Sequence, residues 1–399
     1  MKYNKGEWSE AYAFVKLLGE GKVHASDENL NIIHERFYTI FKIFQDDIRK
    51  FYEIDSNRQI INVIDRNGDI VSQIDSSKFI DIADESLDII KNSRGSSFEV
   101  PILKDFLKEL GIINFKGSSA KKEDIKMEIL DLDLDIPKTL NFTIKSYLGN
   151  KPTLFNASTA TNFLFKIENI SDEEVEYLNS INKDTDRQWR KKRFGKIFEG
   201  YLNKNYNVTF VEEKDKTLYQ NLRLIDSSLP KILAFMLFYF FSHDGVASVS
   251  DLTKYLTRYN PLELDDSEKG TFYKKKVSEF LEAVTFGMMP GEKWDGTHEI
   301  SGGLLTVRKD GDIVCHHIYY DNVSLKNFLF KHTKFESPSG SRHGYGDIYK
   351  ENGEVFFKLN LQVRFKWFLI FYIFFNKNDI IIVNKNINFK KFFSIIKKI

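Results

Sequence analysis

Two neighbouring segments, residues 122–131 (KEDIKMEILD) and 140–146 (LNFTIKS), carry the residue types best suited to chemistry. If both are strands, side chains two positions apart lie on the same face. The first segment then has an apolar face, which consists of Ile125, Met127 and Ile129. Its opposite face is charged. The pattern predicts two strands that each bury one face and present polar groups on the other.

The charged faces of the two strands place an acid next to a lysine. On the second strand Phe142 and Ile144 face the core, so Thr143 and Lys145 lie on the charged side, beside Asp124. Hydrolysis of a phosphodiester needs an activated water, a Lewis acid on the phosphate oxygens and stabilisation of the leaving group. Mg²⁺ is bound by one or two carboxylates. The pair therefore indicates metal-dependent phosphodiester hydrolysis, although alone it is also typical of an ordinary solvated strand face.

A second carboxylate has to come from elsewhere in the chain. In the common form of this arrangement an acid lies two residues before the lysine, but here that position is Thr143, whose hydroxyl is a poor metal ligand. Glu10 on the predicted opening helix is the first candidate for the second metal ligand. Glu128, on the same face as Asp124, is the other candidate.

Polar residues that suit a nucleic acid flank both strands. Residues 118–124 approach the acid through small and basic residues, and residues 146–162 are rich in hydroxyl and amide side chains. Such side chains contact sugar, phosphate or base edges, whereas a capped loop would need only one of these hydroxyls. The candidates for DNA contact in these segments are Lys122, Ser146, Asn156, Ser158 and Asn162.

The predicted elements form an α/β fold, with a mixed central sheet flanked by helices and a helical and β-rich C-terminal half. Apolar spacing predicts a helix at 7–18, and Asn-Gly at 67–68 predicts a hairpin between strands at 60–64 and 69–74. Further helices are predicted at 83–91, 102–110, 157–167 and 230–242, and further strands at 303–307, 313–320 and 355–365.

Composition limits the possible function classes. The chain has 58 basic and 57 acidic residues, so nucleic-acid binding has to come from local patches. Its single cysteine, Cys315, excludes an intramolecular disulfide and a paired-cysteine zinc site, and it fits the cytoplasm. We expect no secretory signal and no membrane span, because no apolar run reaches the ~20 residues that a bilayer requires.

Three regions are expected along the chain. Residues 1–180 would form the catalytic core with a helical and hairpin insertion, and residues 181–366 a recognition and supporting region. Residues 367–399 consist largely of Phe, Ile, Lys and Asn, which AT-rich codons encode. We interpret this tail as lying outside the functional domain.

Three blocks of sequence resemble one known family. Residues 5–30, residues 142–163 and residues 337–365 are similar to the HpaII-type restriction endonucleases. The resemblance implies a type II enzyme of the PD-(D/E)XK nuclease class that uses Mg²⁺ to cut double-stranded CCGG.

The resemblance also implies roles for individual residues. Asp124 would be the metal-binding acid, Lys145 the catalytic lysine and Glu10 the acid from the helix. A palindromic target suits a homodimer with twofold symmetry. A companion cytosine methyltransferase that protects host DNA is implied as well.

Basic residues in the second half are candidates for contact with DNA, because arginine donates to guanine O6 and N7 in the major groove. Residues 186–194 form a basic run with interleaved aromatic residues, for which phosphate contact is favoured over base contact. Arg342 lies among small residues and is preferred for base reading. The candidates are Arg187, Arg190, Arg193, Arg342 and His343.

A histidine-metal nuclease is a competing interpretation. The residues that loosely follow the order of a His-Asn-His nuclease are His316, His317, Asn327 and His332. Residues 313–320 alternate in a way that favours a strand with one histidine buried and one exposed, so this interpretation ranks lower.

A second acid–lysine set, Asp347, Glu354 and Lys358, lies near the C-terminus. Phe356 occupies the position of the expected acid in this set, so residues 357–365 are interpreted as a structural strand. Because Thr143 stands where an acid is expected, a different function is also possible. The chain could be a sequence-specific DNA-binding protein that lacks cleavage activity.

Overall fold

The computed structural model describes residues 1–115, 123–182, 184, 186, 188–213, 215–366, 371–376 and 379–384. The chain forms two compact units, Met1–Phe365 and Lys366–Ile399. In the second unit β17 (Phe371–Asn376) pairs with β18 (Asp379–Asn384) as an antiparallel hairpin.

Helices are spread along the whole first unit. They are α1 (Lys5–Glu20), α2 (Ser76–Asn92), α3 (Pro101–Glu109), α4 (Asp172–Ser180), α5 (Trp189–Leu202), α6 (Thr217–Ile225), α7 (Leu229–Ser242), α8 (Val249–Tyr259), α9 (Lys269–Phe286), α10 (Asn322–His332) and α11 (Gly340–His343), with 3₁₀ turns η1 (Asp46–Ile48) and η2 (Thr159–Thr161).

Strands alternate with these helices. They are β1 (Lys22–Ser26), β2 (Ile32–Gln45), β3 (Lys50–Ile54), β4 (Ile60–Ile64), β5 (Ile70–Asp75), β6 (Ile125–Asp131), β7 (Ile136–Ser146), β8 (Thr153–Phe155), β9 (Asn162–Glu168), β10 (Asn207–Val211), β11 (Gly303–Val307), β12 (Ile313–His317), β13 (Thr333–Phe335), β14 (Ile348–Glu351), β15 (Glu354–Asn360) and β16 (Val363–Phe365).

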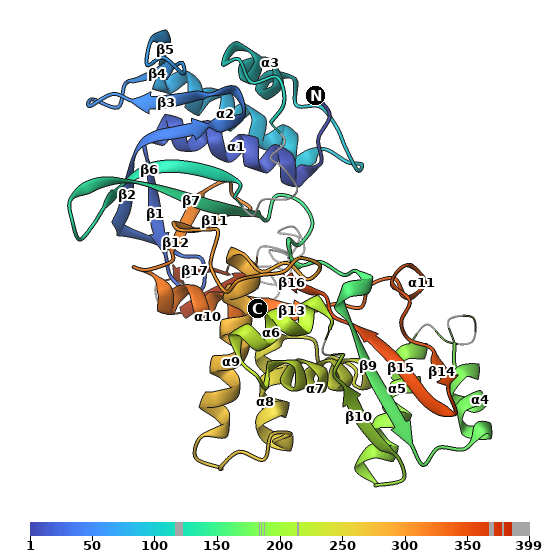
Figure 1. Ribbon diagram of the computed structural model, residues 1–399. Coiled ribbons are helices and arrows are strands. Elements are labelled where there is room, and N and C mark those ends of the chain that lie inside the picture. The colour runs from blue at the N-terminus through green and yellow to red at the C-terminus, as the bar shows by residue number, and fades with distance from the viewer. Residues whose placement is uncertain are drawn as a thin grey trace. The chain divides into compact units, whose positions relative to one another are not determined.

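The largest sheet has nine strands in the order β1-β12-β11-β7-β6-β2-β3-β4-β5 (Figure 1). β1 runs parallel to β12 and β11 parallel to β7, while neighbours such as β6 and β7 are antiparallel. The predicted α/β fold with a mixed sheet is therefore confirmed. The hairpin predicted around Asn67 and Gly68 is confirmed as β4 and β5.

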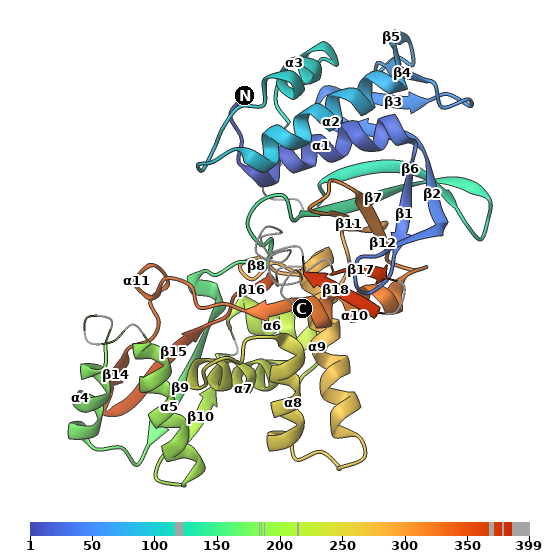
Figure 2. The ribbon, with the colours of Figure 1, turned by 180° about the vertical axis from the view of Figure 1, so that it is seen from behind.

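Helices α1 and α2 lie side by side in both views of the ribbon (Figures 1 and 2). α1 begins at Asn4, whose side chain accepts hydrogen bonds from the amides of Gly6 and Glu7. Near the end of α1, a Cβ on Gly19 would come within 2.8 Å of the side chain of Ile80, so this glycine permits the close approach of α2. The buried face of α1 joins one core with the inward side chains of the large sheet.

Strands β6 and β7 follow the predicted alternation. Ile125, Met127 and Ile129 are at most 5% exposed and belong to the core beneath α1. Ile125 lies opposite Phe142 in the antiparallel register, and Ile144 continues the same apolar face. The two strands and their apolar faces, which determine where the polar residues lie, are confirmed.

A smaller sheet, in the order β10-β9-β15-β14, packs on α5 and α7 through aromatic side chains. Phe165 of β9 stacks on Phe357 of β15 with ring centroids 4.9 Å apart, and Phe238 of α7 packs against both rings. A third sheet has the strand order β13-β16-β8, and its strand β8 is the next strand after β7 in the sequence. The apolar helix predicted at 230–242 is confirmed as α7.

The helix predicted at 157–167 is wrong. The chain forms the short turn η2 and then strand β9. Phe163, Phe165 and Ile167 are buried at every second position, and that alternation fits a strand between β10 and β15. The hydroxyl-rich start of the segment forms a single capped turn at Ser158.

Strands β11 and β12 of the nine-stranded sheet come from the second half of the sequence. The sheet therefore contains strands from both sides of residue 180, the expected end of the catalytic core. Within the described residues no single helix is long and apolar enough to cross a bilayer. In the part of the chain that the structure describes, the one pair of helices long and apolar enough when taken together is α6 and α7, and the pair is bent by 111°.

Candidate active site

Asp124 lies directly before β6, and its carboxylate is hydrogen-bonded to residues of β7. Its Oδ2 accepts hydrogen bonds from the Thr143 hydroxyl (2.8 Å) and from the Ile144 amide (2.6 Å). The Lys145 ammonium lies 3.8 Å from the same oxygen and donates to Thr143 Oγ1 and to the Ile144 carbonyl, both at 3.1 Å. The structure therefore brings together the acid and the lysine that the strand pattern placed side by side.

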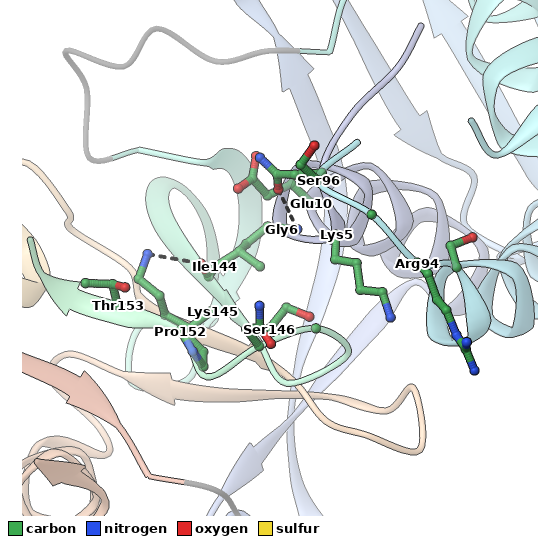
Figure 3. A pocket seen from close by; sticks show the side chains of 15 residues that line it. Lys5, Gly6, Glu10, Arg94, Ser96, Ile144, Lys145, Ser146, Pro152 and Thr153 are labelled. Carbon is green, nitrogen blue, oxygen red and sulfur yellow. Dashed lines mark hydrogen bonds between the residues drawn. The ribbon is translucent and has the colours of Figure 1, made fainter. Parts of the chain in front are cut away.

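Glu10, on α1, faces the same cleft as Lys145 (Figure 3). The pKa of its carboxyl is raised to about 8, mainly by burial and next by the negative charge of Asp124, while the positive charge of Lys145 opposes the shift. These interactions require that the Glu10 carboxyl lie close to both residues. Without a bound cation it is largely protonated at neutral pH.

Glu10 and Lys145 open onto a cleft of about 690 Å³ (Figure 3). One wall consists of the start of α1 and the loop that follows α2. The other wall consists of the end of β7 and the loop that leads to β8. The lining residues are Asn4, Lys5, Gly6, Glu10, Ser93, Arg94, Gly95, Ser96, Ile144, Lys145, Ser146, Gly149, Asn150, Pro152 and Thr153.

The cleft carries positive charge although the chain as a whole is almost neutral. Lys5, Arg94 and Lys145 line it, and among its lining residues Glu10 is the one acid. Because the Glu10 carboxyl keeps its proton up to a pKa of about 8, the cleft attracts anions at neutral pH.

Glu128 is not part of this group. It lies four residues after Asp124 along the strand, a distance of roughly 13 Å at ~3.3 Å per residue. Its carboxylate pairs with Lys42 of β2 at 3.6 Å, and Lys42 also pairs with Glu53. Within the described residues, no cluster of three or more His, Cys, Asp or Glu side chains is placed to hold a metal ion.

The donor atoms at Asp124 nevertheless fit a hard divalent cation. The Asp124 and Glu10 carboxylates and the Ile144 carbonyl are oxygen donors, and Mg²⁺ commonly takes one or two carboxylates and completes its shell with water and phosphate. Burial, and next the charge of Asp124, disfavour a negative charge on Glu10 and raise its pKa, and a bound cation would compensate that charge.

Of the polar residues at 146–162 that were predicted to contact DNA, only Ser146 lines the cleft. Its hydroxyl donates to the Ser9 hydroxyl at 2.8 Å and so ties β7 to α1. Asn156 is exposed, and Ser158 caps η2. Asn162 is buried, and its amide donates to the His343 carbonyl at 2.8 Å. The last three therefore lie outside the cleft of Glu10 and Lys145.

The basic run at the start of α5 has mainly structural contacts. Arg193 is 1% exposed and donates to the carbonyls of Leu178, Asn179, Ile181 and Gly346 and to Asp347. It ties the C-terminal end of α4 to the loop that precedes β14, and at 1% exposure it offers no face to DNA, contrary to expectation. Arg190 packs over the rings of Trp189 and Tyr345 and remains partly exposed.

Helix α11 presents Arg342 to solvent, and His343 is partly exposed beside it. The loop around them is fixed by the bond between Asn162 and the His343 carbonyl. Lys122 and Arg187, the remaining predicted DNA contacts, lie outside the described residues.

The histidine-metal interpretation has no supporting geometry. His316 and His317 are both buried, so the expectation that one is exposed is wrong. His316 stacks on Phe328 of α10, His317 stacks on Tyr38, and burial lowers the pKa of both rings to about 4. Helix α10 covers one face of β12 and Tyr38 covers the other, which explains why neither ring reaches solvent.

The second acid–lysine set is also dispersed. Asp347 pairs with Arg193, and Glu354 pairs with Lys166. Lys358 lies over the ring of Tyr349. Each of these residues has its own structural contact.

Lys5, Arg94 and Asn150 line the cleft, although no pattern in the sequence selects them. The only signal for Arg94 is a basic residue in a run of small residues (SRGSS, 93–97), which also describes an ordinary loop. Their position depends on the packing of α1 against α2 and on the path of the β7–β8 loop.

Known proteins resemble this chain over most of its length. The family model of the HpaII restriction endonuclease matches residues 4–365. The chain is 38% identical over 364 residues to the type II restriction enzyme HpaII of Haemophilus parainfluenzae, a match that covers 91% of this chain and 98% of that protein. No solved structure matches the chain. The chain therefore belongs to the HpaII family of restriction endonucleases.

Proposed function

We propose that the protein is a Mg²⁺-dependent type II deoxyribonuclease of the PD-(D/E)XK class that cuts both strands of DNA at CCGG. One observation carries the proposal: in a member of this family, Lys145 and Glu10 line a positively charged cleft, and Asp124 lies 3.8 Å from Lys145 and interacts electrostatically with Glu10. Membership of the family supports site-specific cleavage. The metal and the target sequence are proposals that rest on the resemblance.

In this proposal Asp124 and Glu10 hold Mg²⁺, with the Ile144 carbonyl as a further oxygen donor. The bound cation would act as a Lewis acid on the scissile phosphate and lower the pKa of an attacking water. The two bonds from Thr143 and Ile144 fix the orientation of the Asp124 carboxylate.

Lys145 would act on the substrate directly. Its ammonium already lies 3.8 Å from Asp124 and is oriented by Thr143 and Ile144. From this position it orients the attacking water or stabilises negative charge that develops on the phosphate. The positive charge of the cleft draws the DNA backbone toward these groups.

The remaining DNA contacts would come from other parts of the chain. Ser146 lines the catalytic cleft, whereas Arg190, Arg342 and His343 belong to the predicted recognition region. We propose that a homodimer binds the palindromic site, one catalytic cleft per strand. In the cytoplasm a cytosine methyltransferase would protect host DNA from the enzyme.

A DNA-binding protein without cleavage activity is the second candidate, and Thr143 favours it. A buried hydroxyl, 1% exposed, stands where the common arrangement has a metal-binding acid. Glu10 offers the missing carboxylate from α1, and for that reason we favour the nuclease.

Plasmid digestion separates the two candidates. Purified full-length protein is incubated with a sequenced plasmid in Mg²⁺ and, as a control, in EDTA. The nuclease produces discrete fragments whose ends map to CCGG, and only when Mg²⁺ is present. A gel shift without cleavage in either buffer favours the binding protein, and fragments that end at another sequence refute the proposed target.

A further inference from the structure

The loop between α2 and α3 presents an arginine to the catalytic cleft. Residues 93–96 line the same cleft as Glu10 and Lys145. Arg94 is exposed, and its guanidinium forms no hydrogen bond or ion pair with any residue that the structure describes. By contrast, Arg36 and Arg364 each pair with an acid.

Both ends of this loop are anchored, so the backbone that carries Arg94 is held in place. At one end the Ser93 hydroxyl donates to the Ile89 carbonyl at 2.7 Å. At the other end Phe98 exchanges two backbone hydrogen bonds, of 3.0 and 3.1 Å, with Tyr3. Gly95 follows Arg94 with φ at 100°, a left-handed conformation that favours glycine and turns the loop sharply.

The charges along the cleft favour an extended polyanion over a small anion. Arg94 and Lys145 lie at opposite ends of the cleft, and Lys5 lies between them (Figure 3). The Lys5 ammonium donates to the Lys91 carbonyl at 2.8 Å, so it is fixed against the end of α2. A strand of DNA whose scissile phosphate lies at Lys145 would place another of its phosphates at Arg94.

We propose that Arg94 is a DNA-positioning residue that holds a backbone phosphate of the strand being cut, at the end of the cleft away from Lys145. A guanidinium suits this role because it donates to a phosphate through two parallel N–H groups. A phosphate contact fixes the register of the DNA without reading its sequence. This inference rests on the proposed function, since it takes DNA as the substrate of the cleft.

Salt dependence of binding tests the assignment. Affinity for a CCGG duplex and for a duplex without that site is measured in EDTA between about 0.05 and 0.3 M KCl. The variants are Arg94→Ala, Arg94→Lys and the matched control Arg66→Ala, whose arginine is exposed in the turn between β4 and β5. One lost phosphate contact lowers the slope of log K against log salt by about 0.9, which corresponds to about 8-fold weaker binding near 0.1 M salt.

We expect Arg94→Ala to show this loss on both duplexes, Arg94→Lys to recover the slope, and Arg66→Ala to match the wild type. The maximal cleavage rate at saturating DNA should change little in Arg94→Ala, unlike its KM. The assignment is overturned if Arg94→Ala and Arg66→Ala give the same slope. It is also overturned if binding weakens only on the CCGG duplex, or if the maximal rate falls while binding is unchanged.

The test stays informative if one part of it fails. Arg94→Ala could unfold at a lower temperature than the wild type. Comparing the salt slopes of Arg94→Lys and Arg94→Ala then still decides whether the positive charge at this position contributes to DNA binding. Wild-type protein that binds duplex DNA but does not cut it in Mg²⁺ would refute the proposed function. The slopes measured in EDTA would then still report on Arg94 alone.

Discussion

Replacing Glu10 with glutamine should change how folding stability depends on pH. In the folded protein the pKa of Glu10 is raised from 4.5 to about 8, mainly by burial and next by the charge of Asp124. In the unfolded chain the carboxyl titrates near its ordinary value. Between these two pKa values the folded state keeps a proton that the unfolded state releases, so the wild type loses stability as pH rises.

The size of the effect follows from the shift. The free energy of unfolding falls by about 1.4 kcal/mol per pH unit across the interval. From pH 4.5 to about 8 the upper limit is therefore about 5 kcal/mol. The Glu10→Gln variant has no such proton, so at pH 8 without metal it should be more stable than the wild type, while at pH 4 the two should be similar.

Urea unfolding between about pH 4 and pH 9 in EDTA measures the difference, with Glu35→Gln as the control because Glu35 is exposed on β2. Added Mg²⁺ should stabilise the wild type at pH 8 and leave Glu10→Gln less affected, because binding to the folded state raises stability. Parallel pH profiles for the wild type and Glu10→Gln would refute both the raised pKa and the position of Glu10 beside Asp124.

The packing and the extent of the family match support three more predictions. Arg193→Ala should lower the free energy of unfolding by about 3–5 kcal/mol, measured by urea unfolding, because it leaves buried acceptors unpaired. The control is Lys192→Ala, at an exposed site, which should leave the urea midpoint of unfolding unchanged. Thr143→Val should slow cleavage about tenfold or more in a single-turnover assay, since Asp124 loses a charge-assisted bond of about 1.5–3 kcal/mol, while Thr143→Ser should retain the rate. A chain that ends at Lys366 should digest plasmid as fast as the full chain, since the family match ends at residue 365.

Local periodicity was sufficient to predict β6, β7 and the faces of their side chains. Alternation at Ile125, Met127 and Ile129 decides which face is buried, and an antiparallel register then places Asp124 opposite Thr143. The apolar helix α7 and the hairpin of β4 and β5 were predictable for the same reason, because each pattern lies within a short segment.

Contacts between distant segments were not predictable in this way. The pairing of β11 with β7 joins residues about 160 positions apart, and nothing in either segment indicates the partner. A hydroxyl-rich start is also typical of a helix cap, so it favours the wrong helix at 157–167, although Phe163, Phe165 and Ile167 alternate as a strand. The structural role of Arg193 depends on carbonyls at the end of α4 and in the loop before β14, which a basic run in the sequence does not reveal.

Cleavage by Lys145→Ala tests the central claim most directly. Single-turnover cleavage of a CCGG duplex in Mg²⁺ and binding of the same duplex in EDTA are compared for the wild type, Lys145→Ala and Lys126→Ala. Lys126 is the control, because it pairs with Asp46 and does not line the cleft. We expect Lys145→Ala to cut about 10²–10⁴-fold more slowly with nearly unchanged binding, and Lys126→Ala to cut like the wild type. Cleavage by Lys145→Ala at close to the wild-type rate would contradict the proposed active site.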